Sequence, residues 1–104
     1  MEEFRIIYKM LNYMRKAMKV ETPDYTPISA EGINIPEVMW LRLVRMMVDE
    51  GYIKGVKLTK DLSGAYSIAG QFEPEITLKG LEYLEENSLM RKAKDIAKGI
   101  VDIL

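Results

Sequence analysis

The sequence predicts one α+β domain in which several helices accompany a single β-hairpin. Three observations lead to this prediction. The chain has 104 residues, a length that suits one domain with one hydrophobic core, so we assign residues 1–104 to a single domain. Apolar residues recur with helical spacing over residues 3–19 and 36–50. Between residues 52 and 72, two strand-like stretches flank a polar turn that contains a glycine.

The first helix is predicted over residues 3–19, because apolar side chains recur there at the spacing of one helical face. These side chains are Phe4, Ile7, Tyr8, Leu11 and Met18. We interpret this face as the one that packs into the core. The prolines and glycine of residues 21–35 then exclude a long helix, and they leave room for one short turn that the Ser29 hydroxyl can cap.

A central helix is predicted from Pro36 to about Glu50, because proline suits the first helical turn and Gly51 readily adopts the left-handed conformation that ends a helix. Asn34 is its candidate cap. The face expected in the core holds Trp40, Leu43, Val44 and Met47. The opposite face holds Val38, Arg42, Arg45 and Asp49, flanked by Leu41 and Met46. We therefore expect the Trp40 ring to be largely buried against the first helix and the hairpin.

The hairpin is predicted to have strands over residues 52–59 and 65–72, with residues 60–64 at its tip and Pro74 after its second strand. Thr77 is expected to cap a helix over residues 78–86. We expect Asn87 and Ser88 to interrupt that helix and a final helix to run from Leu89 to the terminus.

The order helix, short helix, helix, hairpin, helix resembles a winged helix with an additional C-terminal helix. Two segments sharpen the resemblance, VRMMVDEGYIKGV (44–56) and ITLKGLEYLEEN (76–87), which are similar to segments of bacterial winged-helix regulators of the multidrug-resistance and phenolic-acid repressor types. Together with the ending AKGIVDIL, GYIKGV and ITLKGLEYLEENS resemble the YjcQ family, short proteins of Firmicutes and their prophages. The resemblance spans nearly the whole chain and implies a winged-helix-like fold, but little about activity.

The residue types argue against an enzyme. Cysteine and histidine are absent, which removes thiolate ligands, the commonest metal ligand and the side chain that most readily moves protons near neutral pH. The adjacent carboxylates Asp49–Glu50 and Glu85–Glu86 diverge by about 100° on a helix. No glycine loop for phosphate is present. We therefore expect no catalysis, metal or cofactor. The N-terminal residues do not resemble a signal peptide and no apolar run suits a membrane span, so the cytoplasm is the expected compartment.

Double-stranded DNA is the partner that we hypothesise. In a winged helix the exposed face of the central helix enters the major groove, where Arg42 and Arg45 have the shape to bond guanine with two donors. Residues 51–60 contain Lys54, Lys57 and Lys60 and no acid, which favours contact with phosphates, although such lysines also protect edge strands from pairing. The net charge of −1 means that any such contact is local. The chain would then be a transcriptional regulator of prophage type.

Two further hypotheses concern protein partners. Nine of the fifteen residues from Pro36 to Glu50 are apolar, more than one core contact can bury, which also suits an interaction or adaptor module that does not bind DNA. The final helix, residues 89–104, has one apolar face. Its members are Leu89, Ala93, Ile96, Ala97, Ile100 and Leu104. This face either packs on the first helix of the same chain or pairs two chains into a homodimer.

Overall fold

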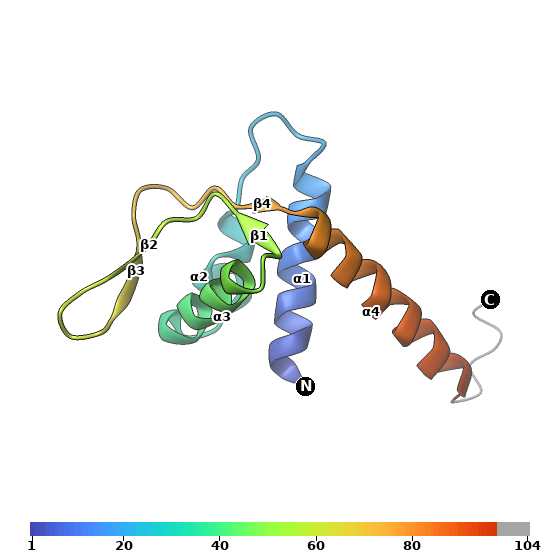
Figure 1. Ribbon diagram of the computed structural model, residues 1–104. Coiled ribbons are helices and arrows are strands. Elements are labelled where there is room, and N and C mark those ends of the chain that lie inside the picture. The colour runs from blue at the N-terminus through green and yellow to red at the C-terminus, as the bar shows by residue number, and fades with distance from the viewer. Residues whose placement is uncertain (98–104) are drawn as a thin grey trace.

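The computed structural model describes residues 1–97, with side chains up to residue 88, and it confirms the α+β class (Figure 1). Its elements in chain order are α1 (Glu2–Ala17), the 3-10 helix η1 (Thr26–Ile28), α2 (Ala30–Ile33), α3 (Glu37–Asp49), β1 (Ile53–Lys54), β2 (Leu58–Lys60), β3 (Tyr66–Ile68), β4 (Glu75–Ile76) and α4 (Leu78–Ala97). In this part of the chain no helix is both long and apolar enough to cross a membrane.

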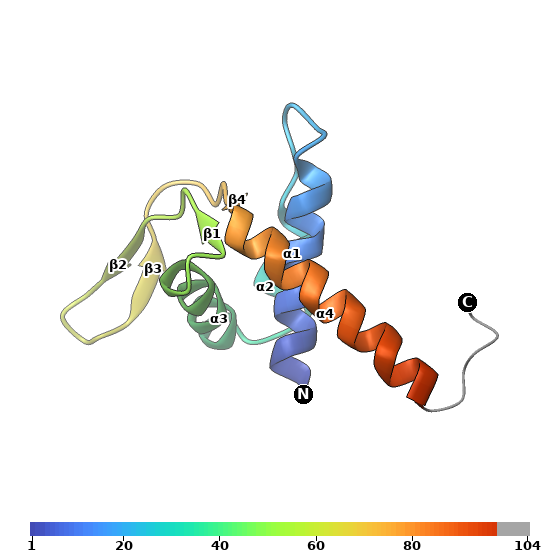
Figure 2. The same cartoon turned by 45° about the vertical axis from the view of Figure 1, so that its right-hand side comes forward.

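The hydrophobic core lies where α1, α3 and the first half of α4 meet the β1–β4 pair (Figures 1 and 2). Its buried side chains include Ile6, Ile7, Met10, Leu11, Met14, Ile28, Trp40, Leu43, Val44, Met47, Ile53, Ile76 and Leu84. The four α3 residues predicted to face inward are all among them. Trp40 is only 6% exposed, which confirms its predicted burial.

The predicted core stripe of α1 is wrong at both ends. Phe4 and Met18 are 57% and 64% exposed, whereas Met10 and Met14 are buried between them. The helix ends at Ala17, so Met18 is its C-cap residue and lies beyond the packed part of the helix. Phe4 lies in the first turn. The helical period therefore indicated the correct face in the middle of α1, where partners on α3 and α4 cover it, but not at the ends.

The turn between α1 and α3 is held by local hydrogen bonds. The predicted cap of α2 is confirmed, since the Ser29 hydroxyl accepts a hydrogen bond from the Gly32 N–H at 3.0 Å. The prediction that Asn34 caps α3 is wrong, because Asn34 ends α2 in the left-handed conformation with φ 64°. Pro36 occupies the N-cap position instead. The connection between α2 and α3 is short, because Asn34, the C-cap residue of α2, is only two residues before Pro36, the N-cap residue of α3.

The predicted strand over residues 52–59 is divided into two at Gly55, whose φ is +83°. Before the turn, β1 pairs antiparallel with β4, with Ile53 opposite Ile76. After the turn, β2 pairs with β3 in the predicted hairpin, with Lys60 opposite Tyr66. The second strand ends at Ile68 rather than near Phe72, since Gly70 turns the chain with φ +77°. The molecule thus has a short sheet at the core and a separate hairpin.

The C-terminal part of the described chain is one continuous helix, α4, and not two. The Thr77 hydroxyl caps it as predicted by accepting a hydrogen bond from the Gly80 N–H at 3.1 Å. The predicted interruption at Asn87 and Ser88 is wrong. The Asn87 side-chain amide donates to the Tyr83 carbonyl at 2.7 Å, one turn back, so its polar group is satisfied on the helix itself. The predicted apolar face of residues 89–104 lies outside the described side chains.

Candidate nucleic-acid interface

The outward face of α3 carries both predicted arginines, and each is exposed. Arg45 has two partners. Its Nε lies 3.6 Å from a carboxylate oxygen of Asp49 one turn later. Its guanidinium also lies over the Tyr66 ring, 4.6 Å from the centroid. Arg42 is exposed and forms no ion pair with a described residue.

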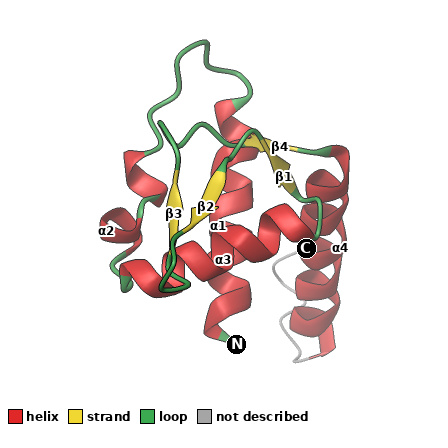
Figure 3. Ribbon diagram, turned by 60° about the vertical axis from the view of Figure 1, so that its left-hand side comes forward, coloured by secondary structure: helices red, strands yellow, loops and turns green. Residues whose placement is uncertain are grey.

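The β2–β3 hairpin lies beside this face of α3 and forms one surface with it (Figure 3). A hollow of about 460 Å³ separates the two elements, and Arg42, Arg45, Met46, Asp49, Gly64 and Tyr66 line it. From the hairpin side, the Lys60 ammonium lies 5.5 Å from the centroid of the Tyr66 ring. Tyr66 therefore brings together one cation of α3 and one cation of the hairpin.

The other two predicted lysines lie away from this hollow. Lys57 is exposed at the base of the hairpin, where its carbonyl accepts a hydrogen bond from the Ala69 N–H at 2.9 Å. Lys54 belongs to β1 and not to the hairpin. Its ammonium lies 3.8 Å from the Glu75 carboxylate across the β1–β4 pair, so its charge is partly neutralised. Of the five predicted residues, the structure groups Arg42, Arg45 and Lys60.

Tyr66 is the residue of this surface that the sequence analysis did not single out. An aromatic residue in a strand is ordinarily interpreted as a packing residue. Its contact with Arg45 depends on the position of the hairpin relative to α3, and its contact with Lys60 depends on the strand register. The sequence offered one signal for this contact: Tyr66 follows Lys60 by six positions, on the other side of the turn formed by residues 61–65.

The tip of the hairpin is shaped by Asp61. Its carboxylate accepts hydrogen bonds from the N–H groups of Ser63 at 2.8 Å and Ala65 at 3.0 Å, and also from the Ser63 hydroxyl. These bonds stabilise the ionised form and hold the pKa of Asp61 below its ordinary value, the Ser63 side chain having the largest effect. The tip thereby presents the fully exposed side chain of Leu62 to solvent.

Among the side chains that the structure describes, up to residue 88, the acidic residues form no group of three or more that is placed to hold a metal ion. The cations that gather around Tyr66 are suited to an anionic partner instead.

These features define a small α+β protein whose exposed central helix and hairpin carry the basic groups. A sequence model described as "YjcQ protein" matches residues 8–103. The relative called "Uncharacterized protein YjcQ", from Bacillus subtilis (strain 168), is 36% identical over 77 residues, which cover 74% of this chain and 78% of the relative. No solved structure matches the chain. The chain belongs to the YjcQ family, which confirms the resemblance seen in its sequence.

Proposed function

We propose that this protein is a winged-helix protein that binds double-stranded DNA, and that it acts in the cytoplasm as a prophage-type transcriptional regulator. In this proposal α3 is the recognition helix and the β2–β3 hairpin is the wing. The observation that carries it is that Arg42 and Arg45 line the hollow between those two elements, while Arg45 and Lys60 both lie against the ring of Tyr66. This surface is basic although the whole chain has a net charge of −1.

The arginines would have different tasks at the DNA. Arg42 lacks an ion-pair partner among the described residues, so it is available to bond a guanine edge with two donors. Arg45 is held between Asp49 and Tyr66, which fixes its direction and favours a positioning contact with a phosphate. On the wing, Lys57 and Lys60 would neutralise phosphates, and Lys54 would contribute less because Glu75 shares its charge.

A short second helix is compatible with this role because η1 and α2 act as one support. The Ser29 hydroxyl donates to the Thr26 carbonyl at 2.7 Å and caps α2 at the same time. A Cβ added to Gly32 would lie 2.3 Å from the Thr26 carbonyl oxygen, so the two short helices are in direct backbone contact. The Trp40 indole then ties α3 to them by donating to the Ile28 carbonyl at 2.8 Å.

The test is a gel-shift assay of the full chain against genomic DNA fragments at two salt concentrations. Retardation at low salt and steep weakening at higher salt are expected. Changing Lys57 and Lys60 together to glutamine should weaken binding to every fragment and lower the salt slope by about one for each phosphate that is no longer neutralised. Arg42→Ala should instead alter base preference by about 1–3 kcal/mol. Lys9→Gln, on α1, is the matched control. A wild-type chain that retards no duplex at low salt would overturn the proposal.

A protein-interaction or adaptor module without DNA binding is the second candidate, and one observation favours it. A hollow of about 260 Å³ opens where α1, α3 and α4 meet, and its lining is mostly apolar or aromatic: Phe4, Ile7, Met46, Met47, Glu50, Tyr52 and Tyr83. Phe4 and Met46 are 57% and 55% exposed there. An apolar partner surface should be bound with little salt dependence, which separates this function from DNA binding.

We also propose a homodimer that pairs the C-terminal helices of two chains through residues 89–104. The continuity of α4 to Ala97 supports this, because a long helix can present its second half beyond the core (Figure 2). Sedimentation of the full chain should give a dimer at tens of micromolar, and a chain that ends at Asn87 should be a folded monomer. A monomeric full chain would contradict the dimer, and a truncated chain that unfolds would favour packing within one chain.

A further inference from the structure

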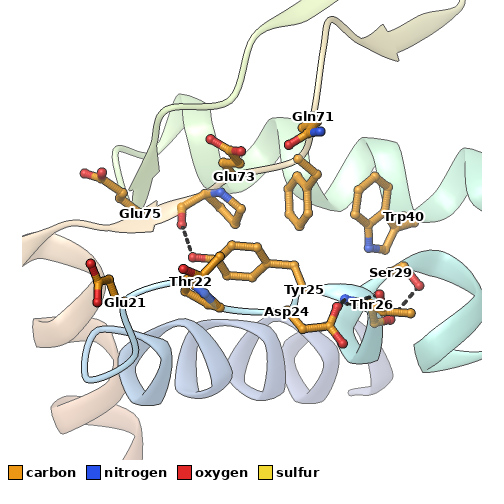
Figure 4. Close-up of a pocket in the computed structure, with 13 residues that line it drawn as sticks. Glu21, Thr22, Asp24, Tyr25, Thr26, Ser29, Trp40, Gln71, Glu73 and Glu75 are labelled. Atoms are coloured by element: carbon orange, nitrogen blue, oxygen red, sulfur yellow. Dashed lines mark hydrogen bonds between the residues drawn. The ribbon is translucent and has the colours of Figure 1, made fainter.

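A cavity of about 650 Å³ lies between the segment that follows α1, residues 21–26, and the segment that links the hairpin to β4, residues 71–75 (Figure 4). Its walls include three aromatic rings and four carboxylates, together with uncharged polar side chains and two prolines. None of the described side chains that line it is a lysine or an arginine. The cavity thus has the opposite charge from the surface between α3 and the hairpin, and DNA would be repelled from it.

Three aromatic rings form a continuous row along the cavity. Tyr25 meets Phe72 edge to face with ring centroids 6.0 Å apart, and Phe72 meets Trp40 in the same manner at 4.9 Å. Hydrogen bonds hold the outer two rings, since the Tyr25 hydroxyl donates to the Pro74 carbonyl at 3.2 Å and the Trp40 indole donates to Ile28. The rings are therefore fixed before a ligand arrives, and their faces carry the negative end of the aromatic quadrupole.

Four carboxylates line the same cavity, from Glu21, Asp24, Glu73 and Glu75, and those of Glu21 and Glu75 lie at the end of the row beyond Tyr25 (Figure 4). Only Glu75 has a cationic partner among the described residues, Lys54 on the neighbouring strand. Burial first, and then the negative charges of Glu75 and Glu73, raise the pKa of Tyr25, so those two carboxylates act on its hydroxyl group. Negative potential from the carboxylates and from the rings therefore acts in the same space.

We propose that this cavity binds a small organic cation, an alkylated ammonium ion whose positive group contacts the rings of Tyr25 and Phe72 close to the Glu73 carboxylate. Aromatic faces attract a weakly hydrated organic cation more readily than a strongly hydrated metal ion. The described residues also lack a group of carboxylates suited to a metal. The size of the cavity leaves room for an ammonium group together with the organic part that bears it. This inference does not depend on DNA binding.

The single tryptophan of the chain is Trp40, which makes its fluorescence a direct reporter of the cavity. The full chain is titrated with choline at constant ionic strength. The matched control ligand is 3,3-dimethylbutan-1-ol, which has the same shape without the charge. Choline should change the emission in a saturable manner, whereas the neutral alcohol and added sodium chloride should not. Equal responses to choline and the alcohol, or no saturable response to choline, would overturn the proposal.

Two substitutions locate the bound cation. Glu73→Gln removes one exposed carboxylate, and Phe72→Leu keeps an apolar side chain while removing the ring. Each should weaken choline binding by at least about threefold, since a cation held by rings and a carboxylate loses one of its attractions. Glu82→Gln, an exposed acid of α4 outside the cavity, should leave affinity unchanged. Circular dichroism verifies that each variant is folded. Equal weakening by Glu82→Gln would indicate general attraction to an acidic surface and would overturn the assigned site.

Discussion

The helical core and the β2–β3 hairpin differ in how their side chains are packed and in the interactions that stabilise them. The core buries whole side chains from α1, α3, α4 and the β1–β4 pair, whereas none of the described residues 57–69 is buried. The hairpin is held by its own ladder and by the contact of Tyr66 with Arg45. Its half-buried Ile68, and Phe72 just after it, pack against the edge of the core. The difference indicates that substitutions on the exposed hairpin should affect the stability of the core much less than substitutions within it, and substitutions in each region test that separation.

The largest effect is expected from Trp40→Ala in the core. The substitution removes a buried ring, its hydrogen bond to the Ile28 carbonyl and its edge-to-face contact with Phe72. The free energy of unfolding should fall by about 3–5 kcal/mol. Urea denaturation followed by circular dichroism measures this, because the variant has no tryptophan. Val38→Ala, on the exposed face of the same helix, should change stability by less than about 0.5 kcal/mol. A decrease below about 1 kcal/mol for Trp40→Ala would contradict the division between core and surface.

A smaller effect is expected where the core sheet meets α4, at Gly80. A Cβ at this position would lie 2.4 Å from the Tyr52 carbonyl oxygen and 2.7 Å from Cγ1 of Ile76. Gly80→Ala should therefore destabilise the protein by about 1–3 kcal/mol, although alanine is ordinarily the better helix former. Thermal unfolding measures the decrease in stability.

The comparison for Gly80 is Gly70, just after the hairpin. Its added Cβ meets nothing within 4 Å, but its φ of +77° disfavours any side chain. Gly70→Ala should cost about 1–2 kcal/mol from backbone strain alone. If Gly80→Ala left the thermal stability unchanged, the result would contradict the close approach of α4 to the Tyr52 carbonyl.

Local patterns in the sequence identified two of the three predicted helix caps and the buried face of α3, but they failed for the cap of α3, where Pro36 and not Asn34 is the N-cap residue. Ser29 and Thr77 were identified as caps because a cap depends only on the next three residues. The inward face of α3 followed from its period, as all four predicted residues are buried. The helix break predicted at Asn87 was wrong because the Asn87 side chain donates a hydrogen bond to the Tyr83 carbonyl within the helix, and the amino-acid composition does not show such a bond.

Long-range contacts were beyond what the sequence could predict. The pairing of Ile53 with Ile76 joins strands more than twenty residues apart, and each strand has only two residues, too few to show alternation. The candidate interface was predicted in part, since the exposure of Arg42 and Arg45 follows from the helical period. The contact of Tyr66 with Arg45 depends on how the hairpin lies against α3, and no local pattern specifies this.

The contact between Arg45 of α3 and Tyr66 of the hairpin is expected to contribute little to stability. A double-mutant cycle with Arg45→Ala and Tyr66→Ala should give a coupling energy of about 0.5–1 kcal/mol, the usual range for an exposed cation over a ring. Chemical denaturation of the four proteins measures it. The cycle of Arg42→Ala with Tyr66→Ala is the matched control and should give less than about 0.3 kcal/mol, within ordinary additivity. A coupling energy above about 2 kcal/mol for Arg45 and Tyr66 would mean that the hairpin is part of the core.

The smallest effect is expected at the hairpin tip, on lowering the pH. The hydrogen bonds from Ser63 and Ala65 favour the ionised Asp61 carboxylate and lower its pKa in the folded chain. A carboxylate whose pKa is lower in the folded chain than in the unfolded chain stabilises the fold fully above its unfolded pKa, which is roughly 4 for aspartate. This stabilisation is lost as the pH falls through the pKa that the group has in the folded chain. Because Asp61 is exposed, the effect should remain local to the tip.

Nuclear magnetic resonance titration from neutral pH to about pH 2 tests this prediction at single residues. The amide signals of Ser63 and Ala65 should shift together with a midpoint below the ordinary aspartate value, while core amides such as that of Val44 remain unchanged over the same step. In Asp61→Asn, the shared transition should disappear, because no proton is exchanged at that position. A midpoint at or above the ordinary value would show that the tip bonds do not favour the charged carboxylate. A simultaneous change in the core signals would show instead that the hairpin and the helical core unfold as one unit.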